Sequence, residues 1–314
     1  MKKIGIDQTS AWLFAIFLSC ASFASIYFLL DMLATDPSQR MLEEIANMES
    51  LEQIDEGDAS PEEEASIQPE ERLPPENNLA ESKNLGGVTP WSYRGRSGPD
   101  FWGSLSDDYM DCQIGREQSP IDINNPIRSG ELKNLVFYYK PSSVTIINDG
   151  HSISGSFSPG NYLEYQGNSF SLVSFSLHLP SEHTVDGIPF DMEMQFVHRS
   201  GDGKSLNLGI FIEEGNRPNK FLSGLWKGMP KKPQQSGGEV RLDLMKILPK
   251  NHKYYAYKGS QTTPPCREGV EWLLLVQTIK VSSKQIDEFI EIYRNNSRPI
   301  QAINKRSVFV SSNR

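Results

Sequence analysis

Residues 175–198 read FSLHLPSEHTVDGIPFDMEMQFVH, and this stretch decides the fold. Its pattern predicts two strands joined by a polar turn. Side chains alternate between the two faces of a strand, so Ser176 and His178 share one face of the first strand. Glu193 and Gln195 share one face of the second strand for the same reason. If the two strands are neighbours, these polar side chains converge on one point.

The same stretch resembles the central sheet of the alpha-class carbonic anhydrases. The resemblance is carried by SEHTVDG at 181–187 and by the frame MExxxVH at 192–198. In that family two histidines of the first strand and one of the second bind zinc. The corresponding positions here are Ser176, His178 and Gln195, and one of the three is a histidine. The resemblance therefore implies an inherited framework around a changed metal site.

Further motifs extend the resemblance to about residues 91–306. WSY at 91–93 and CxxGxxQSPIDI at 112–123 are similar to the opening of bacterial members, and NSRPIQ at 296–301 to their closing motif. They imply an α+β fold, mainly β, with a large, mostly antiparallel central sheet. Apolar alternation predicts strands over 144–147, 169–179, 206–212 and 272–281. A capping box at 282–285 predicts a helix, with a core stripe of Ile286, Phe289, Ile290 and Tyr293.

Carbonic anhydrase chemistry needs zinc on three neutral imidazoles, with an open position for water. A serine hydroxyl and a glutamine amide are poor replacements for imidazole nitrogen. We therefore expect no zinc, no active catalytic residue, and an inactive protein that serves as a binding or structural component of an envelope complex. One alternative is an active carbonic anhydrase that hydrates carbon dioxide with unusual metal ligation, through His151 or a metal other than zinc. A second alternative is a surface adhesin for acidic glycans.

The resemblance assigns the remaining positions of this site. His151 falls where the family keeps its proton shuttle, and Thr262 and Thr263 lie in its conserved threonine turn. Glu182 corresponds to the carboxylate that holds this turn's first threonine, and Glu193 to the one that orients the third metal ligand. Even without a metal, Glu193 could accept a hydrogen bond from the Gln195 amide. The predicted pocket residues are Ser174, Asn207, Gln261, Val270 and Trp272.

The other histidines are interpreted as structural. By resemblance, His183 and His198 belong to the buried sheet, and we expect both to be hydrogen-bonded core residues rather than metal ligands. His252 lies in PKNHK at 249–253, which predicts a solvated turn.

The N-terminal region predicts a membrane anchor over residues 1–35. Residues 11–30 contain no charged residue and are long enough to cross a bilayer as a helix. Lys2 and Lys3 precede them, so the positive-inside rule places the N-terminus in the cytoplasm and the rest of this single-pass protein in the periplasm or another extracytoplasmic space. A cleaved signal peptide or lipidation at Cys20 are the alternatives.

Charge is spread unevenly along the chain. Residues 36–83 carry 15 acidic and 3 basic residues, and since the whole chain carries −9, the remainder is about +3. We expect residues 36–88 to form an acidic juxtamembrane helix and a linker rich in proline and glutamate, and residues 89–314 to form the domain. Partners are predicted to be the membrane, a protein of the envelope complex and a polyanion at Lys227, Lys231 and Lys232, without nucleic acid.

Cysteine usage fits export from the cytoplasm. Cys20 lies in the apolar run, which leaves Cys112 and Cys266 for the domain. Downstream of an export signal a disulfide is expected, and by resemblance exported family members link these two positions.

Overall fold

The computed structural model describes residues 91–312. The chain divides into two units, Met1–Glu81 and Ser82–Arg314, and the described residues all belong to the second. The predicted anchor, acidic helix and linker lie outside the described residues. Within residues 91–312, no helix combines the length and the apolar character needed to cross a membrane.

A twelve-stranded mixed sheet forms the body of the domain. Its main path runs β12-β4-β5-β7-β10-β11-β14-β13-β15-β2, and β6 pairs with β3 and β7. Most pairs are antiparallel, as predicted, and the β11–β14 and β15–β2 pairs are parallel. The strands are β1 Asp122–Ile123, β2 Ile127–Ser129, β3 Val136–Tyr138, β4 Ser142–Asn148, β5 Ile153–Phe157, β6 Tyr162–Tyr165, β7 Asn168–His178, β8 Thr184–Val185, β9 Ile188–Pro189, β10 Met192–Ser200, β11 Ser205–Gly215, β12 Gln235–Leu242, β13 Tyr254–Ser260, β14 Glu268–Ser282 and β15 Phe309–Ser311.

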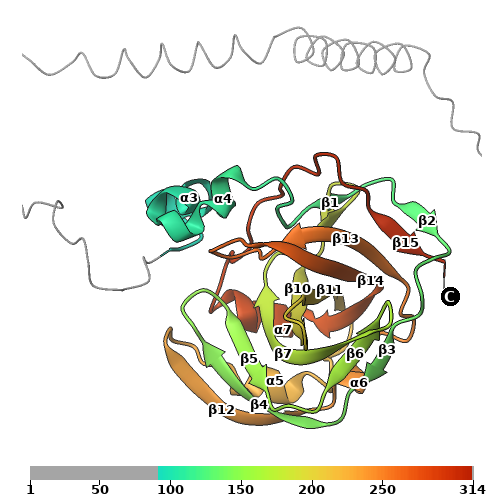
Figure 1. The fold of residues 1–314 in the computed structure, drawn as a ribbon. Coiled ribbons are helices and arrows are strands. Elements are labelled where there is room, and N and C mark those ends of the chain that lie inside the picture. The colour runs from blue at the N-terminus through green and yellow to red at the C-terminus, as the bar shows by residue number, and fades with distance from the viewer. Residues whose placement is uncertain (1–90, 313–314) are drawn as a thin grey trace, which may run out of the picture. The chain divides into compact units, whose positions relative to one another are not determined.

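Helices are short and lie around this sheet. They are η1 Gly95–Ser97, η2 Pro99–Phe101, α3 Trp102–Leu105, η3 Asp107–Tyr109, α4 Asp111–Ile114, α5 Ser223–Gly228, α6 Leu244–Ile247 and α7 Ser283–Ile290. Figure 1 shows the long strands β7, β10, β11 and β14 in the middle of the domain, with α3 and α4 as a small cluster at one side. The centre of the sheet is therefore the part of the domain that can hold side chains most rigidly.

The predicted strands are confirmed, because each lies within or overlaps a strand of the sheet. In β7 the apolar side chains of Phe175 and Leu177 are buried, while Ser176 lies between them on the opposite face. The link from β7 to β10 is longer than the predicted turn, since it contains the small hairpin β8–β9. The hairpin joins β1 in a separate three-stranded sheet.

The capping box of α7 is also confirmed. The Ser282 hydroxyl accepts from the backbone N–H of Gln285, and the Gln285 side chain accepts from that of Ser282. Phe289 is fully buried, whereas Ile290 is 36% exposed. The predicted core stripe is therefore wrong at Ile290, the last residue of the helix, while Tyr293 packs against the core from beyond the helix end.

Candidate functional site

Three predicted positions meet where β7 and β10 pair. Ser176 lies directly opposite Gln195 in the register of these two antiparallel strands, and His178 lies opposite Glu193. The side chains of Ser176, His178 and Gln195 line a single cleft of about 190 Å³. The convergence predicted from residue spacing is confirmed.

His178 is fixed in one orientation. Its Nδ1 lies 2.9 Å from the carbonyl oxygen of Asn296, and its Nε2 lies 2.9 Å from the hydroxyl of Ser176. A carbonyl can only accept, so Nδ1 carries a proton and donates to Asn296, while Nε2 shares its hydrogen bond with the Ser176 hydroxyl. The side chain is 2% exposed. His178 therefore offers one oriented imidazole nitrogen to the cleft.

Gln195 is held by two buried carboxylates. Its Nε2 donates to Glu182 Oε2 at 2.7 Å and to Glu193 Oε1 at 3.0 Å. Both amide protons are used in this way, which leaves the amide oxygen as the potential ligand atom. The hydrogen bond to Glu193 is the one that the sequence predicted for a glutamine at this position.

Glu193 is the best-satisfied carboxylate of the site. It is fully buried and accepts from the backbone N–H groups of Glu182 and His183 and from the His183 ring. Burial alone would raise the pKa of Glu193, but the charge of His183 and the hydrogen bonds from it lower the pKa below its usual value. Gly209 makes room for this group, because a Cβ there would lie 3.0 Å from Glu193 Oε1 and 2.4 Å from a Leu274 methyl carbon.

A buried arginine lies beside Glu182, and the charges of the two residues interact. The backbone N–H of Arg298 donates to Glu182 Oε1, and its guanidinium donates to Gln118, to the carbonyl of Ser119 and to that of Cys112. Burial lowers the pKa of Arg298 to about 10, so the side chain stays charged at neutral pH. The sequence motif at 296–301 identified Arg298 as part of the family pattern but did not reveal this role.

The predicted core histidines are confirmed. His183 and His198 are both fully buried. His183 Nε2 lies 2.6 Å from the Tyr257 hydroxyl, and His198 Nε2 lies 2.7 Å from the Tyr139 hydroxyl. Burial lowers the pKa of His198 to about 4, so its ring is neutral near pH 7.

His252 is not the solvated turn residue that was predicted. Its ring packs edge-on against Phe137, with 4.8 Å between ring centroids, and partial burial lowers its pKa. No local pattern indicates this contact, because Phe137 is far from His252 along the chain.

Two aromatic residues close the outer part of the cleft. The ring of His151 stacks on Trp91 with 3.7 Å between centroids, and its Nε2 lies 2.8 Å from the carbonyl oxygen of Trp91. The Tyr93 hydroxyl is buried and has no hydrogen-bond partner within residues 91–312. Burial raises the pKa of Tyr93, and the charge of Glu182 raises it further. Sequence reasoning placed His151 here but missed both aromatic residues.

Most of the other predicted site residues line the cleft, and two do not. Those that line it are Asn207, Gln261, Thr262, Thr263 and Val270. Trp272 is fully buried behind the cleft and donates from its indole nitrogen to the Ser260 carbonyl, so it is not a wall residue. Ser174 lies two residues before Ser176 on β7 and is not among the lining residues. Both corrections have one cause: residue spacing gives the face of a strand but not the depth of the cleft.

The predicted disulfide between Cys112 and Cys266 is present. It joins α4 to the turn that follows Thr262 and Thr263. The cleft wall is thereby covalently attached to the first helical layer of the domain.

The predicted polyanion patch is partly neutralised. Lys231 forms an ion pair of 2.9 Å with Glu291, and both side chains are exposed. Lys227 and Lys231 lie on the rim of one shallow pocket that Glu288 also lines. A polyanion partner at this patch stays a prediction.

The three converging residues do not fit zinc as three imidazoles do. They supply one imidazole nitrogen, one hydroxyl oxygen and one amide oxygen, whereas protein zinc is bound by thiolate, imidazole or carboxylate. Within the described residues, no group of three or more His, Cys, Asp or Glu side chains could hold a metal ion. The donor set of this chain thus differs from a three-histidine cage.

Comparisons with known proteins support the resemblance. The family model described as eukaryotic-type carbonic anhydrase matches residues 97–312. A carbonic anhydrase of Nostoc sp. (strain PCC 7120 / SAG 25.82 / UTEX 2576) is 39% identical over 227 residues, which cover 69% of this chain and 84% of that protein. A carbonic anhydrase of Neisseria gonorrhoeae is 38% identical over 229 residues, 71% of this chain and 88% of that protein. The solved structure of the Thermovibrio ammonificans alpha-carbonic anhydrase with sulfanilamide has a TM-score of 0.69 and 38% identity, covering 71% of this chain and 100% of that one.

These likenesses correct the predicted function. The expectation of a catalytically inactive protein without zinc is wrong, because the relatives at 38–39% identity are named for the enzyme and enzymes of this family use zinc. The expectation rested on Ser176 and Gln195 alone. Ser176 and Gln195 supply only the ligand atoms of one site, whereas the likeness to the Nostoc carbonic anhydrase extends over 227 residues.

Proposed function

Because this chain belongs to the eukaryotic-type carbonic anhydrase family, we propose that it catalyses the reversible hydration of carbon dioxide in the cleft that His178 lines. The observation that carries this proposal is the orientation of His178. Its Nδ1–H donates to Asn296, so Nε2 is oriented toward the Ser176 hydroxyl that lines the cleft. A reactive centre needs a group that is positioned in this way before substrate arrives.

The size of the cleft supports a very small substrate. Its volume of about 190 Å³ lies below the range of about 300–1,000 Å³ that is usual for drug-sized ligands. Val270 gives it an apolar wall, while Asn207, Gln261 and Thr262 supply polar groups. Carbon dioxide and bicarbonate are both small enough to enter. Apolar carbon dioxide suits the Val270 wall, and charged bicarbonate suits the polar groups.

We expect turnover to be slower than in relatives with three histidines. The cleft supplies a single imidazole nitrogen, and the amide protons of Gln195 are committed to Glu182 and Glu193. Unusual ligation of this kind predicts an activity that depends on His178 and that increases when the missing imidazoles are added.

The test is carbon dioxide hydration by the purified full chain, followed by stopped-flow with a pH indicator, with metal content measured on the same sample. Activity above the uncatalysed rate is expected in the wild type, its loss in His178→Ala, and an increase in the Ser176→His/Gln195→His double variant. His252→Ala, a partly buried histidine outside the cleft, is the matched control and should retain activity. A wild type no faster than His178→Ala would refute the proposal.

We also propose that the domain works outside the cytoplasm, behind an N-terminal anchor. This is supported by the uncharged run at 11–30 and by the disulfide between Cys112 and Cys266, a bond that persists in oxidising compartments. Cell fractionation combined with protease protection tests it. Recovery of the full-length chain in the cytosolic fraction with both thiols reduced would contradict it.

A further inference from the structure

A second and larger cavity lies apart from the His178 cleft. It has a volume of about 900 Å³ and shares no lining residue with the cleft. We call it the β13 groove, because residues 256–258 of β13 form its floor. Its apolar lining residues are Leu132, Tyr165, Ala256, Tyr257 and Phe309. This volume falls within the range of small-molecule sites.

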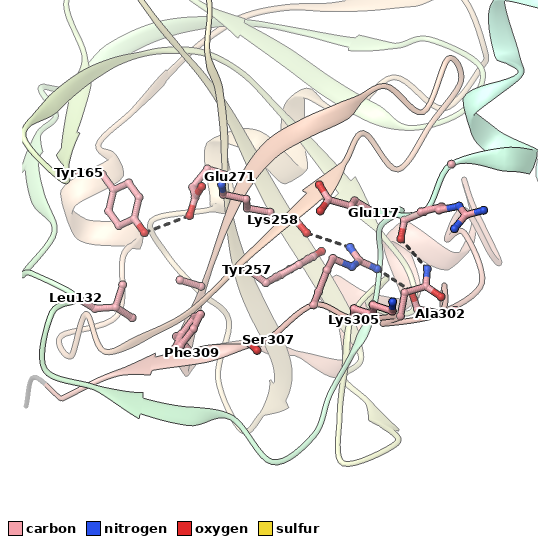
Figure 2. Close-up of a pocket in the computed structure, with 15 residues that line it drawn as sticks. Glu117, Leu132, Tyr165, Tyr257, Lys258, Glu271, Ala302, Lys305, Ser307 and Phe309 are labelled. Carbon is pink, nitrogen blue, oxygen red and sulfur yellow. Dashed lines mark hydrogen bonds between the residues drawn. The ribbon is translucent and has the colours of Figure 1, made fainter.

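The groove has two chemically different ends. Figure 2 shows Tyr165 and Glu271 at one end and Ala302 and Lys305 at the other, with Tyr257 between them. The Tyr165 hydroxyl donates to Glu271 at 3.2 Å, and burial raises the pKa of Glu271. Negative charge is therefore unfavourable at the Glu271 end.

Arg306 gives the opposite end a fixed positive charge. Its Nε, Nη1 and Nη2 donate to the carbonyl oxygens of Ile303, Lys258 and Ala302, and its guanidinium lies 5.8 Å from the centroid of the Tyr257 ring. A guanidinium has five N–H groups, so these bonds leave one free on each terminal nitrogen. None of the ion pairs found within residues 91–312 includes Arg306.

The lining as a whole is positively charged. Four basic residues, Arg116, Lys258, Lys305 and Arg306, face two acidic ones, Glu117 and Glu271. The charges of Glu117 and Glu268 act on Arg306 from a distance, but neither forms an ion pair with it. A guanidinium that is already oriented by carbonyl groups is suited to bind a carboxylate or sulfonate through its two remaining N–H groups. Tyr257 is only 2% exposed, so the apolar surface open to a ligand comes mainly from Phe309, which is 39% exposed, and from half-buried Leu132.

We propose that the β13 groove binds an organic anion of small-molecule size, with its acidic group on Arg306 and its apolar body against Leu132 and Phe309. Glu271 selects against a second anionic group at the far end. This site is independent of the proposed hydration of carbon dioxide, and either one can fail without the other.

The test uses three probes of one shape that differ in charge: 2-naphthoate, 2-naphthalenemethanol and 2-naphthylmethylammonium. Their affinities for the purified full chain are measured by isothermal titration calorimetry. We expect 2-naphthoate to bind at least tenfold more tightly than the alcohol and the ammonium compound to bind most weakly. Equal affinities, or a preference for the cation, would overturn the proposal.

Variants then locate the probe. Arg306→Gln should weaken 2-naphthoate at least tenfold, and Lys305→Glu and Phe309→Ser, which change exposed side chains, should each weaken it several-fold without loss of folding. Lys284→Glu makes the same charge change on α7, away from the groove, and should leave the affinity unchanged. If affinity persists in both Arg306→Gln and Lys305→Glu, the anion does not bind here.

Discussion

The His178 cleft and the β13 groove are built on the same sheet by opposite means. In the cleft, buried polar side chains hold one another, as Glu193 holds both His183 and Gln195. In the groove, the main charged group is held by backbone carbonyls, and the walls are aromatic and aliphatic. A network of side chains fixes geometry but tolerates no missing member. The Arg306 guanidinium is held by backbone carbonyls, so the side chains around it can be substituted without releasing it.

Loss of the disulfide should have the largest effect on the unfolding free energy, and it should destabilise the cleft and the groove together. The bond between Cys112 and Cys266 closes a loop with a sequence separation of 154 residues that contains both strands of the cleft and the floor of the groove. The Cys112→Ser/Cys266→Ser variant is expected to lose about 5 kcal/mol of unfolding free energy in the loop-entropy model. Urea unfolding measures this, and reductant should bring the wild type to the same stability. A variant as stable as the wild type would contradict this prediction, because it would show that the disulfide adds nothing to the stability that packing provides.

A matched pair of glutamate substitutions tests the contrast directly. Glu193→Gln leaves buried donors around it without their charged acceptor, and we expect a loss of about 3 kcal/mol. Glu271→Gln in the groove should cost less than about 1 kcal/mol, because its carboxyl is partly solvated and keeps its bond to Tyr165. Chemical denaturation of both variants provides the comparison, and equal losses would contradict it.

Acid should act with opposite signs on a core histidine, His198, and on Glu271 of the groove. The pKa of His198 is about 4 in the folded chain and about 6.5 when unfolded, so the unfolded state binds more protons between these values. Stability should fall by about 3 kcal/mol as pH drops from 6.5 to 4. The raised pKa of Glu271 acts in the opposite direction, since its folded state binds the proton more readily. Urea unfolding at several pH values, with His198→Gln as the nontitrating control, should show a shallower decline in the variant.

The smallest expected effect concerns the rim of the groove. Phe309 is 39% exposed, and Phe309→Ser should change the unfolding free energy by about 1 kcal/mol or less. Thermal unfolding measures this beside the loss of 2-naphthoate affinity. A large destabilisation would mean that the groove is part of the core rather than a surface site.

Local patterns predicted what local physics determines. Apolar alternation predicted the strands, because every second residue of a strand points to the same face and that face is buried. The capping box predicted α7, because its hydrogen bonds join residues only three apart. Strand spacing also predicted that Ser176, His178 and Gln195 converge, whereas their correspondence to metal ligands came from resemblance. The disulfide was expected from the export signal as well as from resemblance. Contacts between distant segments could not be predicted, among them the stack of Trp91 on His151 and the packing of His252 on Phe137. The inference of inactivity failed differently, since it extended two substitutions to the function of a whole domain.

Tyr257 has a consequence for how the two sites can be studied. Its ring forms part of the groove floor, while its hydroxyl bonds to His183, which in turn contacts Glu193 beside the cleft. One aromatic side chain is therefore all that separates a groove ligand from the buried imidazole. The nuclear magnetic resonance signals of the His183 ring should serve as a built-in reporter of groove occupancy, without any label attached to the ligand.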